Sequence, residues 1–358
     1  YKANKFNFER LRFKFYGMAD TAFQAFMKGE LDILGINKAE IWVKKATGEV
    51  FRRNWVIKQK IYNHSPIGFQ GWAMNMRKPP FDDVRVRKAI CHLIDRRKMN
   101  ATMMFNQYFL HRSYYEDLYD KDHPCPNKLV EFDVAAARKL LAEAGWKPNP
   151  QTGILEKNGQ PFVIEFLIRS PDAKRFLAHF REALNKVGIR LAVVSKDWSA
   201  WIKDMDQFNF MMTWAAWGAG VKKDPEPMWA SKEGKRQGGN NITGFSDAKV
   251  DALIEKQKTI FDIAQRHEIV RQIDQIVYNQ YPYALLWNLN YHRILYWNKF
   301  GTPPTVFSKY GDIDSAIVYW WLDQDAEADL REARKNGETL PGRPLEVHFD
   351  ECFNPKKN

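Results

Sequence analysis

The sequence predicts an α/β protein made of two lobes. Its 358 residues are too many for one simple core. Twice along the chain, over residues 7–35 and 162–194, a strand pattern, a helix pattern and a second strand pattern follow one another. Strands that alternate with helices are typical of a sheet covered by helices.

The first of these units begins with residues 7–15, which alternate apolar and charged side chains as a half-buried strand does. A short helix from Thr21 to Lys28 follows, with Gly29 as its left-handed stop. The next strand starts at Asp32. We therefore expect a β-α-β unit with a right-handed connection.

A rigid elbow separates the strand that contains Trp72 from the next helix. Pro79 and Pro80 fix φ and end the strand. Asp82 or Asp83 can then cap a helix and place negative charge at its N-terminus. The apolar face of that helix is predicted to be Val86, Ile90, Leu93 and Ile94.

The middle of the chain continues the α/β pattern. A helix over 135–144 is capped by Asp133 and ended by Gly145. The elements predicted after it are a strand at 162–168, a helix ended by Gly188, a strand at 191–194, a helix at 198–206 and a strand at 208–217. The polar, Gly- and Pro-rich segment 218–244 then lies at the C-terminal end of a strand, where long loops usually bind ligands.

The last third is expected to hold three helices and three strands. Ser246 is predicted to cap the first helix, with Phe261 facing inward. The strands are predicted at 283–289, 293–297 and 317–321, before a helix at 326–335 and a loose basic tail. The predicted domains are 1–66 (part of lobe I, ending in a crossover), 67–309 (lobe II), and 310–358 (a return strand to lobe I with the C-terminal helix and tail).

Composition narrows the class of protein. The net charge is +12, but basic residues are spread among acids, so no nucleic-acid module is expected. No apolar run approaches the roughly 18 residues that span a membrane.

No signal peptide is recognisable, and Tyr1 is not an initiator Met, so the chain is expected to be processed or incomplete. Cys125 and Cys352 both fall in loop-like segments and could pair.

Motifs for catalysis and cofactors are absent. The sequence holds no GxGxxG, GxxxxGK[ST], HExxH or GxSxG. His123 and Cys125, like His348 and Cys352, are close in sequence but have no matching second pair, so neither metal nor cofactor is expected. Asp224 is followed by Pro-Glu-Pro. This segment is either a turn stiffened by its prolines or a contact for a ligand. The sequence favours binding over turnover.

Four stretches resemble the family-5 extracellular solute-binding proteins, the peptide receptors of ABC importers. In chain order they are residues 22–33 (AFQAFMKGELDI), 75–90 (NMRKPPFDDVRVRKAI), 135–146 (AAARKLLAEAGW) and 240–254 (NNITGFSDAKVDALI). A narrower resemblance, to the Yej-type branch, rests on residues 66–71 (PIGFQG), 105–115 (FNQYFLHRSYY) and 296–300 (YWNKF).

The resemblance implies a type II periplasmic binding protein whose two lobes close on an extended peptide and deliver it to an ABC permease. It implies a monomer that lies in the periplasm or is lipid-anchored at the outer face of a cell membrane. Family members carry well over a hundred residues before the position of Tyr1. The first lobe is therefore expected to be incomplete in this chain.

The same resemblance implies a binding segment after the strand at 208–217, whose backbone pairs with the peptide. Trp214, Trp217 and Trp72 would form sequence-tolerant walls, although core packing is an equal alternative for each. The polar anchors would be Asp224, Asn240 and Asn241, and Asn75 and Gly218 complete the expected set. Two other functions stay open: an oligosaccharide receptor that uses the Trp rings, and a secreted enzyme on the same scaffold.

Overall fold

The chain folds into two compact units in a computed structural model that describes residues 4–353. Unit 1 takes the residues up to 66, 102–107 and those from 289 onward; unit 2 takes 67–101 and 108–288. The predicted boundary at 309 is wrong because strand β13 (His292–Trp297) pairs with β1 (Ile33–Gly35) and β2 (Val56–Tyr62) of unit 1.

Unit 1 is built on a four-stranded sheet with the order β1-β13-β2-β16, in which only β16 (Glu346–His348) runs parallel to its neighbour. Two apolar clusters pack against it, one around Phe26 and Trp42 and one around Ile61 and Trp320. The remaining elements of the unit are α1 (Ala19–Met27), a π-helix (Ile41–Lys45), α2 (Glu49–Arg52), β14 (Phe300–Gly301), α11 (Asp314–Tyr319), β15 (Trp321–Leu322), α12 (Gln324–Asn336) and a 3₁₀ turn (Asp350–Cys352).

Two strands predicted for unit 1 are not formed. Residues 7–15 are irregular, with Phe13 67% and Phe15 94% exposed, so alternation alone did not make a strand. Without that strand the predicted β-α-β unit is absent, and β1 pairs antiparallel with β13 instead. Residues 314–319 form helix α11 where a strand over 317–321 was predicted, because Trp320 turns inward and donates to the Val306 carbonyl.

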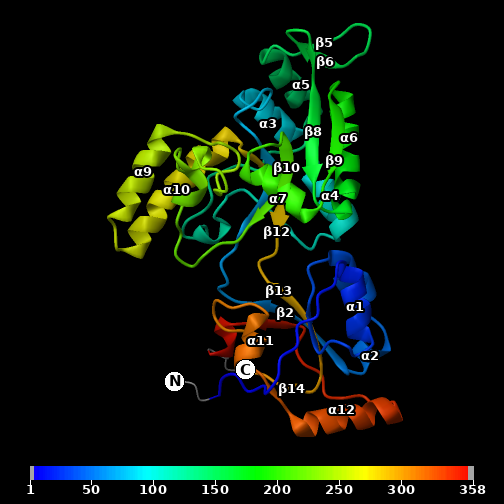
Figure 1. Cartoon of the computed structure of the whole chain (residues 1–358). Helices are drawn as coiled ribbons and strands as arrows, with labels where there is room; N and C mark the ends of the chain where they lie inside the picture. The colour runs from blue at the N-terminus through cyan, green and yellow to red at the C-terminus, as the bar shows by residue number, and fades with distance from the viewer. Residues whose placement is uncertain (1–3, 354–358) are drawn as a thin grey trace. The chain divides into compact units, whose positions relative to one another are not determined.

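Unit 2 is organised around a five-stranded sheet with the order β11-β3-β10-β8-β9. Strands β8 (Val163–Ile168), β9 (Arg190–Ser195) and β10 (Met212–Trp217) run parallel, whereas β3 (Phe69–Met74) and β11 (Tyr283–Leu285) pair antiparallel. Helix α6 (Lys174–Lys186) covers one face, and α9 (Ala248–Lys258) and α10 (Ile263–Gln280) lie side by side on the other (Figure 1).

Smaller elements complete unit 2. They are α3 (Val84–His92), α4 (Arg96–Met104, which begins in this unit), β4 (Phe109–Leu110), a 3₁₀ turn (Glu116–Leu118), α5 (Val134–Glu143), β5 (Lys147–Pro148), β6 (Leu155–Lys157), β7 (Gln160–Pro161), a 3₁₀ turn (Pro171–Ala173), α7 (Trp198–Asp206), α8 (Glu226–Trp229), a 3₁₀ turn (Glu233–Lys235) and β12 (Trp287–Asn288).

Helix ends in unit 2 follow the predicted caps. Asp83 accepts from Arg85 N at the start of α3, and Asp133 accepts from Ala136 N at the start of α5. The β8-α6-β9 unit is confirmed, and Gly188 takes a φ of +79° after α6. Two details are wrong: Asp247, not Ser246, caps α9, and Phe261 is 96% exposed because it lies in the turn between α9 and α10.

Arg77 fixes the far end of the long loop 218–244. Its guanidinium donates to the carbonyls of Gly234, Asn241 (3.1 Å) and Ile242 (2.7 Å). Burial without a carboxylate partner lowers the pKa of Arg77 to about 10. A Cβ on Gly244, which has a φ of +74°, would lie 2.7 Å from Arg77 Cζ. The loop backbone is therefore built around this one side chain.

Replacing Arg77 should loosen the loop. Arg77→Met would leave the partly buried carbonyls of Gly234 and Ile242 without their donor, at roughly 1–3 kcal/mol for each unsatisfied group. We expect urea unfolding, followed by circular dichroism, to show a loss of about 2–4 kcal/mol. Arg181→Met, at an exposed position on α6, is the matched control and should change stability by less than about 0.5 kcal/mol. Equal losses in both variants would contradict the assignment.

The segment after β4 is attached to α10 by one buried carboxyl group. Asp274 is fully buried and accepts from Tyr114 N (2.8 Å), Tyr119 Oη (2.8 Å) and Asn127 Nδ2 (3.2 Å). Desolvation raises the pKa of Asp274 to about 7, with Glu116 adding to the rise and the hydrogen bonds opposing it. Asp274 thereby holds the 3₁₀ turn at Glu116–Leu118 against α10.

This burial should make stability depend on pH. The folded pKa of Asp274, about 7, lies above the unfolded value of about 3.9. The native state therefore keeps a proton that the unfolded state releases, and this contribution to stability is lost as pH rises from about 4 to 7.

The asparagine of Asp274→Asn cannot titrate. The difference in unfolding free energy between wild type and this variant should therefore change steadily from pH 4 to pH 7, as measured by urea unfolding at a series of pH values. Asp325→Asn, at an exposed position on α12, should give a curve parallel to wild type. A constant difference for Asp274→Asn from pH 4 to 8 would contradict the assignment.

Candidate functional site

The end of β10 presents backbone that no strand of the sheet pairs with. The antiparallel ladder with β3 ends at the pair Trp217–Phe69. Beyond it, Gly218, Ala219 and Gly220 take no helix or strand assignment, and both glycines are exposed. Gly68 lies against this point: a Cβ there would be 2.0 Å from the Trp217 carbonyl oxygen. The two backbones touch here with no room for a side chain.

Trp214 and Trp217 flank this end of β10 on opposite faces of the sheet. Trp214 packs edge-on against Phe176 and Trp287, and its Nε1 donates to Gln70 Oε1 at 3.0 Å. Trp217 lies against the cluster under α9 and α10, and its Nε1 donates to Tyr283 Oη at 3.1 Å. Both indoles are half-buried, so each is fixed in place while leaving ring surface exposed.

Asp224 lies further along the same loop and is exposed. Its Oδ1 accepts from Glu226 N, two residues further on, at 3.1 Å. The carboxylate is thus held by one oxygen while its charge stays at the surface. Asn240 is exposed as well, near the other end of the loop.

Three predicted ligand residues are buried, which corrects their assignment. Trp72 is 0% exposed and packs on Phe166 and Phe180. Asn75, also 0% exposed, donates to the Phe208 and Phe210 carbonyls, and Asn241 bonds with Ala230 and Phe245. Period-2 alternation does not distinguish a buried side chain on the helix-covered face from one that reaches a ligand.

Sequence reasoning missed Gly68 and Gln70 as parts of this site. Both lie in the stretch 66–71, whose resemblance to the Yej-type branch assigns no role to either residue. Their roles depend on the β3–β10 register, which places Gly68 and Gln70 beside the end of β10. A glycine at the edge of a strand was the available signal, since it often marks close approach of another backbone.

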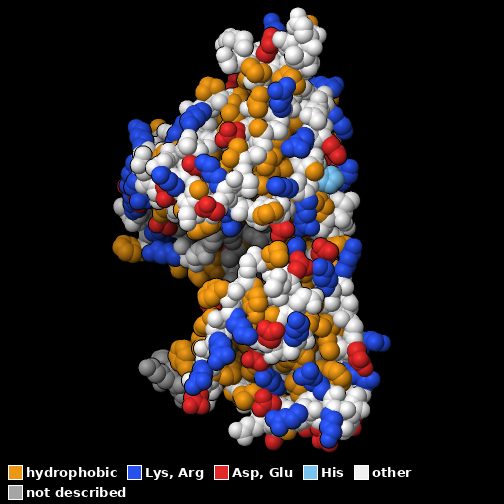
Figure 2. All heavy atoms as spheres, turned by 45° about the vertical axis from the view of Figure 1, so that its right-hand side comes forward, with side chains coloured by type: hydrophobic (Ala, Val, Ile, Leu, Met, Phe, Trp, Pro, Cys, Tyr) orange, Lys and Arg blue, Asp and Glu red, His pale blue; other side chains and the backbone are white. Residues whose placement is uncertain are grey.

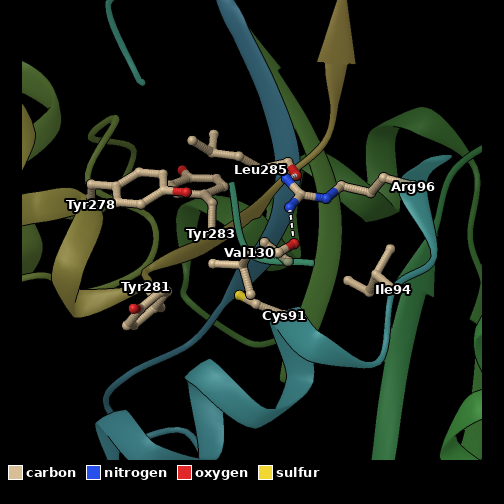
Figure 3. A pocket seen from close by; sticks show the side chains of 9 residues that line it. Cys91, Ile94, Arg96, Val130, Tyr278, Tyr281, Tyr283 and Leu285 are labelled. Carbon is tan, nitrogen blue, oxygen red and sulfur yellow. Dashed lines mark hydrogen bonds between the residues drawn. The ribbon is translucent and has the colours of Figure 1, made fainter. Parts of the chain in front are cut away.

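A hollow in unit 2 that is lined by Cys91, Arg96 and Leu285 is too small for a ligand. It encloses about 10 Å³, the space of one water. Arg96 reaches across it and donates to the carbonyls of Leu285 (2.7 Å) and Val130 (Figure 3). Burial raises the pKa of the Cys91 thiol to about 12, so this thiol is unreactive at neutral pH.

Lys and Arg side chains are spread among Asp and Glu over the face seen in Figure 2, as the sequence predicts. Cys125 and Cys352 are both free. Within residues 4–353 no group of three or more His, Cys, Asp or Glu side chains is arranged to hold a metal ion. No helix in that range is long and apolar enough to cross a membrane.

Comparison with known proteins gives curated relatives of greater length. The uncharacterized protein y4wM of Sinorhizobium fredii is 27% identical over 351 residues, which cover 88% of this chain and 52% of the relative. The uncharacterized protein YejA of Escherichia coli is 25% identical over 372 residues, covering 93% of this chain and 60% of YejA. The chain thus spans roughly half the length of these relatives, and the match to YejA confirms the resemblance to the Yej-type branch.

Among solved structures, the oligopeptide-binding protein AppA of Bacillus subtilis has a TM-score of 0.71 at 21% identity, over 85% of this chain and 58% of AppA. This likeness confirms the predicted fold class. The model of the bacterial extracellular solute-binding proteins, family 5 Middle, matches residues 1–239. Because that match covers more than half of the 358 residues, the chain belongs to the family-5 bacterial extracellular solute-binding proteins.

Proposed function

We propose that the protein is the substrate-binding component of an ABC importer and that its ligand is an extended peptide. The observation that carries this proposal is the segment Gly218–Gly220, whose backbone pairs with no strand of the sheet and which follows the half-buried indoles of Trp214 and Trp217. The structure of AppA was solved with a nonapeptide, which supports a peptide as the ligand here.

A peptide would add to the free backbone at the end of β10. Main-chain hydrogen bonds give affinity without reading side chains, as in other cases of strand addition. Trp214 and Trp217 would supply apolar surface at low cost in side-chain entropy. Asp224, with one carboxylate oxygen held by Glu226 N, would attract an amino group of the peptide, and Asn240 would offer a neutral polar contact.

After capture, the receptor would deliver its peptide to an ABC permease in the inner membrane. Family membership supports this partner, as well as a location in the periplasm or at the outer face of a cell membrane. The protein would act in import rather than in turnover, since the family it belongs to consists of solute-binding proteins.

Isothermal titration tests the ligand class. We expect mixed peptides of about five to nine residues to bind, with affinity that changes little when single side chains are exchanged. Xylo- and cello-oligomers, which also stack on indole rings, should not raise the thermal unfolding midpoint. Stabilisation by these sugars together with no heat from any peptide would overturn the proposal.

Removing the indole of Trp214 should weaken peptide binding. Trp214→Ala deletes an indole that is already held in position by Phe176 and Gln70, and we expect peptide affinity to fall on the order of tenfold, about 1.4 kcal/mol. Trp198→Ala is the matched control, because Trp198 is a 56% exposed tryptophan on α7 that stacks on Trp201. Equal affinity for both variants would exclude Trp214 from the site.

A further inference from the structure

Lys223 is a charged side chain buried within the candidate binding loop. Its side chain is 4% exposed. A buried ammonium group is costly unless it is paired and hydrogen-bonded. Lys223 Nζ meets this need by pairing with the Asp117 carboxylate and donating to the Gly220 carbonyl oxygen at 3.0 Å. One ammonium group therefore joins the loop to another part of unit 2.

Lys223 and Asp117 are each attached to one of the two helices α9 and α10. The Lys223 carbonyl accepts from Gln257 Nε2 of α9 at 3.0 Å. Asp117 belongs to the 3₁₀ turn that Asp274 holds against α10 through Tyr114 N and Tyr119 Oη. The ammonium group thus has a set position relative to the two helices that cover this face of the sheet.

The bond to Gly220 matters because the segment before it has little to order it. Gly218 and Gly220 lack side chains, so fixing their backbone costs more conformational entropy than fixing that of other residues. A carbonyl held at Gly220 limits the directions that the backbone of Gly218 and Ala219 can take. Ordering before the ligand arrives removes that cost from binding.

We propose that Lys223 is a positioning residue that, with Asp117, holds Gly218–Gly220 in the conformation that pairs with the peptide main chain. This inference rests on the proposed function. Lys223 would not touch the ligand; it would act through the Gly220 carbonyl.

The test combines a protein variant with a change in the peptide backbone. N-methylation at successive positions of a neutral heptapeptide identifies the amide whose loss weakens binding to wild type most, expected to be about tenfold by titration calorimetry. In Lys223→Met we expect affinity for the unmodified peptide to fall about tenfold and the methylation penalty to shrink to less than about threefold. A merely structural role would lower both affinities equally and leave the penalty unchanged.

Lys222→Met is the matched control, because Lys222 is the exposed neighbour; it should keep both the affinity and the penalty. Should Lys223→Met fail to fold by circular dichroism, Asp117→Asn removes the charge that fixes the ammonium group and should also reduce the penalty. An unchanged penalty in a folded variant overturns the inference while peptide binding by wild type stands. No peptide binding by wild type overturns the proposed function and this inference with it.

Discussion

The antiparallel pairing of β3 with β10 determines where every part of the candidate site lies. Its register runs from Met74–Met212 to Phe69–Trp217. A shift by one residue would exchange the two faces of the sheet. In the observed register Trp214 faces α6 and Trp217 faces α9 and α10, and the ladder stops where Gly68 brings the two backbones together. The free backbone that follows is a consequence of that stop.

Charged side chains anchor both ends of the loop that leaves this ladder. A loop offers carbonyl groups that no strand pairs with, and buried carbonyls need donors. Arg77 supplies donors at Gly234, Asn241 and Ile242, and Lys223 supplies one at Gly220. These cations lie near opposite ends of the loop. Its middle is held by packing, because Trp229 of α8 is 0% exposed and lies among aromatic side chains of the core under α9 and α10.

Local signals in the sequence were enough for most elements of unit 2. Asp83 and Asp133 are caps and Gly188 is a left-handed stop because each feature depends on a few adjacent residues. Residues 7–15 show the limit of this reasoning, since alternation makes a strand only where a partner strand is present.

The candidate site was only partly predictable for a related reason. Trp214 and Trp217 belong to β10, and Gly218 and Asp224 lie in the loop after it, so the prediction of that one strand located all four. The burial of Trp72, Asn75 and Asn241 depends on helices and loops far away in sequence. Gly68 and Lys223 take their roles from partners at Trp217 and Asp117, which no local pattern reveals.

Pairing of a peptide main chain with the end of β10 is most directly tested by amide hydrogen exchange at Gly218, Ala219 and Gly220, with and without saturating peptide. These amides take no part in the sheet ladder, so we expect them to exchange rapidly in the free protein. Strand addition predicts that at least one of them slows by tenfold or more when peptide is bound. Unchanged exchange at all three amides, with peptide binding shown by calorimetry in the same sample, would contradict it.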